Sequence, residues 1–104
     1  MAWFVLLVSG VLEAVWATAL GRADGFSRPV PTVVFVVGLV LSMVGLAVAL
    51  RDLPVGTAYA VWVGVGAVGT VGYAMATGAE SVSLVKILLL SGIVGCVVGL
   101  KVLH

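Results

Sequence analysis

Four long apolar runs, separated by short polar breaks, divide the chain at nearly equal intervals. The runs do not alternate between apolar and polar residues with the period of two that is typical of barrel strands, so each predicts a helix. Each run is about 20 residues long, which is the length of helix needed to cross a hydrocarbon core of about 30 Å. The predicted helices cover about residues 2–20, 32–50, 57–77 and 82–103.

The polar breaks contain residues that end or start helices. GRADGFSRPVP (21–31) combines glycines, charges and prolines, and Pro31 suits the first turn of the next helix. In RDLPVG (51–56), Pro54 cannot continue the preceding helix. GAES (78–81) leads into the last run. The breaks therefore read as short connections between helices.

The composition of the chain agrees with this pattern. Its 104 residues are 63% hydrophobic and 9% charged, and the mean hydropathy of +1.39 lies far above that of a soluble domain. Four spans use nearly the whole length. We therefore expect an all-α integral membrane protein with a single four-helix domain, residues 1–104.

A secretory signal peptide is the alternative interpretation of the first run. ATA (17–19) has the small-x-small pattern that a signal peptidase prefers. No Lys or Arg precedes the run, however, and an acidic residue lies at its middle, and both features are unlike a signal peptide. The pattern favours a membrane-spanning helix.

The cationic residues give almost no preference for one orientation in the membrane. With alternating helices, Arg22, Arg28 and Lys86 lie on one side, and Arg51 and Lys101 lie on the other with the amino terminus. This balance predicts insertion in both orientations, and hence pairing of two copies as an antiparallel dimer of dual topology. It is also compatible with one fixed orientation and a partner chain that supplies the inverse one.

Glycines mark possible packing faces on the last two predicted helices. Gly95 and Gly99 form a GxxxG pair, and with Gly92 they predict a dimer-packing stripe, although glycine is common in membrane helices generally. GVGAVG begins at Gly64 and includes Gly66. This segment predicts either a hinge or a smooth packing face.

Glu13 is the one ionisable residue inside the first predicted helix. A charge near the bilayer midplane costs at least about 2.5 to 3.5 kcal/mol, so a carboxylate there needs a reason. A structural hydrogen bond between helices is one reason, and an ion or proton site is the other. The second is favoured because hydrogen-bond donors occur at similar depth on three helices. These donors are Trp16, Ser42, Tyr59 and Trp62.

A buried carboxylate of this kind suits exchange between a proton and a cation. Burial disfavours its charged form, whereas donor hydrogen bonds favour that form. Two copies in a dimer would titrate as a unit, and competition for the site would couple movements in opposite directions. The sequence has no ATP-binding loop, nucleophile triad or metal-ligand spacing, since His104 is terminal and Cys96 is a lone thiol. We therefore expect proton-driven transport, with no cofactor and no enzymatic reaction.

The layout resembles the small multidrug resistance family. A lone membrane-embedded Glu lies in the first of four helices, and LPVGTAYAVWVGVGAVGT (53–70) is similar to the third-helix signature of that family. EAVW (13–16) resembles the guanidinium-exporter subtype, in which a Trp follows the central Glu by three residues. Ser42 and DGFSR (24–28) also fit that subtype.

The resemblance implies an antiparallel dimer in the bacterial inner membrane, in which two Glu13 side chains bind guanidinium or protons in alternation. It implies that Trp16, Ser42 and Trp62 orient the carboxylates and that Tyr59 changes partners as access alternates. Guanidinium is planar and its N–H groups match a carboxylate bidentately, so a rigid polar site selects it. The expected partners are guanidinium, protons and the lipid bilayer, with no nucleic acid.

The chain departs from the family pattern at several positions. Gly21 and then Arg22 stand where a Lys usually follows the first helix, Val63 replaces a small hydroxyl residue, and YAMATGAES (73–81) replaces a bulkier Phe-rich end. These departures are compatible with one half of a heterodimer completed by a homologous chain. Two alternatives stay open: export of hydrophobic quaternary ammonium or aromatic drug cations, and a membrane subunit that does not transport alone.

Overall fold

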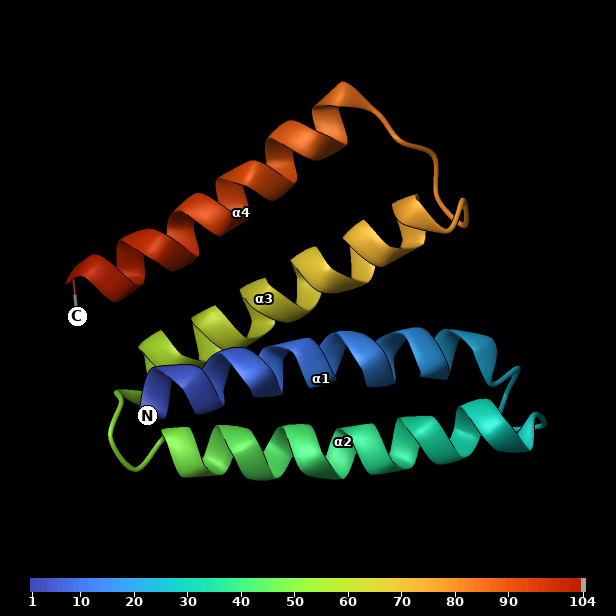
Figure 1. Cartoon of the computed structure of the whole chain (residues 1–104), viewed down its shortest axis with the longest axis horizontal. Coiled ribbons are helices and arrows are strands. Elements are labelled where there is room, and N and C mark those ends of the chain that lie inside the picture. The colour runs from blue at the N-terminus through green and yellow to red at the C-terminus, as the bar shows by residue number, and fades with distance from the viewer. Residues whose placement is uncertain (104) are drawn as a thin grey trace.

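The computed structural model describes residues 1–103 and contains four long helices (Figure 1). Successive helices run in opposite directions, so the amino terminus and the end of α4 lie at the same end of the molecule. Each helix has 20 to 22 residues and is long and apolar enough to cross a membrane. They are α1 (Ala2–Arg22), α2 (Pro29–Ala49), α3 (Val55–Ala76) and α4 (Leu84–Leu103).

Three helices begin at residues other than those expected, and each start has a local reason. α3 starts directly after Pro54, whose backbone is extended, instead of at residue 57. α2 starts at Pro29 instead of residue 32. Backbone N–H groups in the first turn of a helix have no acceptor within the helix, so a proline there costs no hydrogen bond. α4 starts at Leu84 instead of residue 82. The Ser83 hydroxyl accepts a hydrogen bond of 3.1 Å from the backbone N–H of Lys86, which caps the helix.

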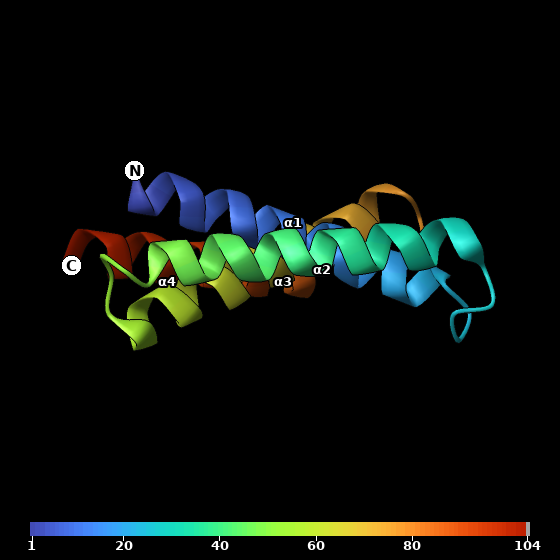
Figure 2. The ribbon, with the colours of Figure 1, turned by 90° about the horizontal axis from the view of Figure 1, so that it is seen from below.

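α1 is the central helix of the bundle. It packs along α2 on one side and α3 on another, whereas α2 and α3 touch each other little. α4 packs against α3 and diverges from it toward the connection between them (Figure 1). Figure 2 shows the bundle from the side of α2, which lies in front of the other helices. No residue of α4 is buried, and Lys101 near its end lies 5.8 Å from the ring centroid of Trp3.

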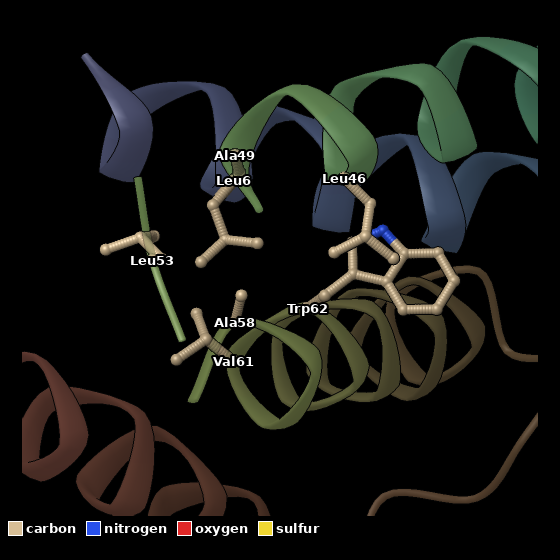
Figure 3. Close-up of a cluster of buried hydrophobic side chains, with 7 residues drawn as sticks. All are labelled: Leu6, Leu46, Ala49, Leu53, Ala58, Val61 and Trp62. Carbon is tan, nitrogen blue, oxygen red and sulfur yellow. The ribbon is translucent and has the colours of Figure 1, made fainter. Parts of the chain in front are cut away.

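The apolar core joins α1, α2 and α3 near the end of the bundle that holds the amino terminus (Figure 3). The helices approach closely because glycines face their neighbours. A Cβ at Gly45 of α2 would lie 2.6 Å from the Ser9 hydroxyl oxygen, and one at Gly10 of α1 would lie 2.7 Å from the Cβ of Val65. The core consists of Leu6, Leu46, Ala49, Leu53, Ala58, Val61 and Trp62.

Candidate functional site

Glu13 lies near the middle of α1 and directs its side chain at α3. Its carboxylate lies against Gly66, where an added Cβ would overlap Oε1. Gly66 is buried and Glu13 is partly buried. The absence of a side chain at position 66 thus provides the space that the carboxylate fills.

Two polar atoms on this face of α1 are buried without a hydrogen-bond partner among the described residues. They are Oε1 of Glu13 and the indole Nε1 of Trp16, one helical turn apart. A buried polar group without a partner is costly and rare in folded proteins. Both atoms therefore have unmet hydrogen-bonding capacity, one as an acceptor and the other as a donor.

Trp16 is held by aromatic and backbone contacts with α2. Gly38 packs against it so closely that a Cβ there would lie 3.0 Å from the Cβ of Trp16. The Trp16 ring meets Phe35 edge-on, with 5.9 Å between ring centroids, and Phe35 in turn lies 5.8 Å from Phe26. These contacts hold the indole against α2, one helical turn along α1 from Glu13, through a chain of rings that reaches the connection between α1 and α2.

Ser42 and Trp62 form a buried hydrogen-bond network with the backbone of α1. The Ser42 hydroxyl donates to the Ser9 carbonyl oxygen at 2.7 Å, and the Trp62 indole Nε1 donates to the Ser42 oxygen at 3.1 Å. Figure 3 shows the indole nitrogen of Trp62 directed toward α2. The expected orienting role would have these donors bond to Glu13, but here they bond to each other and to Ser9.

Tyr59 lies at the edge of this network. Its ring is 6.0 Å from that of Trp62, tilted by 34°, and the residue is 56% exposed. Among the hydrogen bonds within residues 1–103, none joins Tyr59 to Glu13. The structure therefore places Tyr59 near the site but on an open surface of the single chain.

The glycines singled out from the sequence have different surroundings. Gly64 is buried against α4, where an added Cβ would lie 2.9 Å from a methyl carbon of Val97. α3 continues unbroken past Gly64 and Gly66, so both positions serve close packing in this conformation. The other three face open space, with no atom within 4 Å of an added Cβ: Gly92, Gly95 and Gly99.

Sequence reasoning missed some of the residues that build the site. The sequence predicts Gly66 only as a hinge or packing residue and predicts no role for Phe35. The contact between Trp16 and Phe35 has no signal in the sequence, because it depends on how α2 is placed beside α1. Within the described residues, no three His, Cys, Asp or Glu side chains gather to hold a metal ion.

Comparison with known proteins agrees with the four-helix arrangement. The sequence model of the family described as Small Multidrug Resistance protein matches residues 1–93. The chain is 46% identical over 101 residues to a protein of Yersinia pseudotuberculosis named guanidinium exporter, covering 97% of each chain. Proteins of the same name from Salmonella typhimurium and Proteus vulgaris are 45% and 42% identical, again over 97% of this chain and 96% and 97% of theirs.

Proposed function

The chain belongs to the Small Multidrug Resistance family, and we propose that it is a proton-coupled antiporter that exports guanidinium and small guanidinyl cations. It is a multi-pass protein of the bacterial inner membrane. The names of its relatives support the choice of substrate.

The observation that carries the proposal is the unpartnered carboxylate oxygen of Glu13. It lies near the middle of a membrane-spanning helix, where an isolated charge is expensive. A proton or a cation on the carboxylate removes that cost. Guanidinium fits because its parallel N–H groups form two charge-assisted hydrogen bonds with one carboxylate.

Exchange at one carboxylate accounts for antiport. A proton and a guanidinium ion cannot both occupy Glu13, so binding of one requires release of the other. When the site opens to the periplasm, a proton displaces guanidinium. When it opens to the cytoplasm, guanidinium displaces the proton, and the proton gradient drives export.

The neighbouring polar side chains have separate roles in this account. Trp16 lies one turn from Glu13 with its indole N–H unpartnered, so it donates to the carboxylate in the occupied site. Ser42 and Trp62 connect α2 and α3 to the backbone of α1 and so fix the walls around Glu13. Tyr59 lies beside Trp62 and changes partners as the opening alternates.

An antiparallel homodimer forms the complete transporter in this proposal. The single chain leaves Tyr59 exposed and an open glycine stripe (Gly92, Gly95 and Gly99) on α4. Such a stripe allows two helices to approach closely in lipid. In the dimer, two Glu13 carboxylates share one chamber and titrate as a coupled pair.

Flux measurements on purified protein in liposomes test the proposal. With an imposed pH gradient, guanidinium should move against the proton flow, and Glu13→Gln should abolish this movement. Glu80→Gln is the matched control, because Glu80 lies in the exposed connection between α3 and α4. Absence of guanidinium flux under a proton gradient contradicts the proposal, as does flux of quaternary ammonium dyes alone.

A further inference from the structure

A groove with a volume of about 500 Å³ lies between α1, α2 and α3. Four of its residues recur at spacings of three or four along α1 and therefore share one stripe of that helix. The lining residues do not include the proposed transport residues Glu13, Trp16, Ser42, Tyr59 and Trp62. The groove is thus separate from the proposed transport site. Its lining includes Val11, Val15, Thr18 and Arg22 of α1, Val34 of α2 and Tyr73 of α3.

The groove is apolar along its length and cationic at one end. Its polar lining residues are Thr18, Arg22 and Tyr73. Arg22 is the exposed last residue of α1, and its guanidinium carbon lies 5.5 Å from the ring centroid of Tyr73. The ion pair found within residues 1–103 joins Lys86 to Glu80 and does not involve Arg22. The Arg22 guanidinium is therefore free to meet an anion from outside the chain.

The depth of the groove corresponds to one leaflet of the bilayer. Eleven residue steps separate Val11 from Arg22, and at 1.5 Å of rise per residue they span about 16 Å. Half of a hydrocarbon core of about 30 Å is about 15 Å. If Arg22 lies at the level of the headgroups, then Val11 lies near the midplane.

We propose that this groove binds an anionic phospholipid, with an acyl chain along α1 and the phosphate at the guanidinium of Arg22. The apolar length suits one acyl chain, and arginine pairs with phosphate through parallel N–H donors. Basic positions between membrane helices attract anionic headgroups in this way. The inference stands on the groove alone and does not depend on the proposed transport.

Native mass spectrometry of the full chain in detergent, titrated with phosphatidylglycerol, tests this assignment. One arginine near the membrane surface is worth about a fivefold change in the affinity for an anionic lipid. Arg22→Gln should weaken binding by about that factor and remove the preference over phosphatidylcholine. Arg28→Gln makes the same charge change at the far end of the connection between α1 and α2, outside the groove lining, and should leave binding unchanged. Equal effects of the two substitutions would overturn the proposal.

A second pair of variants tests the acyl chain. Val15→Trp fills the groove and should reduce binding of both lipids while the helical circular dichroism stays the same. Val15→Cys in a Cys96→Ser background tests whether a second copy of the chain, instead of a lipid, covers the groove. Rapid disulfide formation between two copies at position 15 would show that a second copy covers the groove and would overturn the lipid assignment. Both readouts are independent of guanidinium flux.

Discussion

The carboxylate of Glu13 occupies the space that a side chain at Gly66 would take. This relationship joins the central acid of α1 to the middle of α3. The space needed by the carboxylate explains why position 66 is a glycine. Any change at residue 66 acts directly on the group proposed to bind the substrate.

Substitution of Gly66 by alanine should therefore reduce transport strongly. The added methyl group overlaps the carboxylate, so Glu13 must shift. A displacement of about 1 Å at a reacting group can cost on the order of 100-fold in rate. We expect a loss of this size in guanidinium flux, measured in liposomes at matched protein density.

Gly72→Ala is the control for this substitution. It makes the same change on the same helix, where no atom lies within 4 Å of the added Cβ. Its flux should match that of the unchanged protein. If Gly66→Ala transports as fast as Gly72→Ala, Glu13 does not bind the substrate from the position described.

The bond from Trp62 to Ser42 should contribute measurably to stability. Ser42→Ala leaves the buried indole N–H without a partner, which costs about 1 to 3 kcal/mol. In a Trp62→Phe background the same substitution should cost less, because the donor is already gone. Unfolding in mixed micelles measures both values, and equal costs in the two backgrounds would show that the bond is not formed.

Ser91→Ala provides the reference for a serine whose hydroxyl bonds only within its own helix. The Ser91 hydroxyl donates to the Ile87 carbonyl oxygen of α4 at 2.8 Å and is exposed. Its removal should change the free energy of unfolding by less than about 0.5 kcal/mol. A similar cost for Ser42→Ala and Ser91→Ala would remove the special role given to the buried network.

The open glycine stripe on α4 should be part of the dimer interface. Gly95→Leu places a bulky side chain where two helices are expected to approach closely. It should weaken dimerisation on the order of tenfold, measured by energy transfer between labelled copies in liposomes. Cys96→Leu is the control, since it enlarges the exposed neighbouring residue on the same helix. Equal effects of the two substitutions on dimerisation would contradict a specific place for Gly95 in the dimer interface.

The four-helix architecture was predictable from the sequence because lipid imposes strict rules. The hydrocarbon thickness fixes the length of each span, and every backbone group must bond within its own helix. The structure confirms four membrane-spanning helices. The starts of α2, α3 and α4 differ from the expected residues because Pro29, Pro54 and Ser83 favour particular first turns.

The contacts within the site were less predictable. In a soluble helix an apolar stripe marks the buried face, but in lipid both faces are apolar and this signal is absent. The sequence therefore identified Glu13 and its candidate donors without showing which helix the carboxylate meets. Ser42 bonds to the Ser9 carbonyl because α1 and α2 approach closely at Gly45, a feature that depends on tertiary packing.

The central claim is that protons and guanidinium exchange at Glu13, and proton release measures this most directly. Guanidinium added to the purified protein in weakly buffered detergent should release protons. The number of protons released should increase as the starting pH is lowered, because the site is then more fully protonated before guanidinium binds. Glu13→Gln should release none, and Glu80→Gln should behave as the unchanged protein. Guanidinium binding without proton release, or release that persists in Glu13→Gln, would contradict the account.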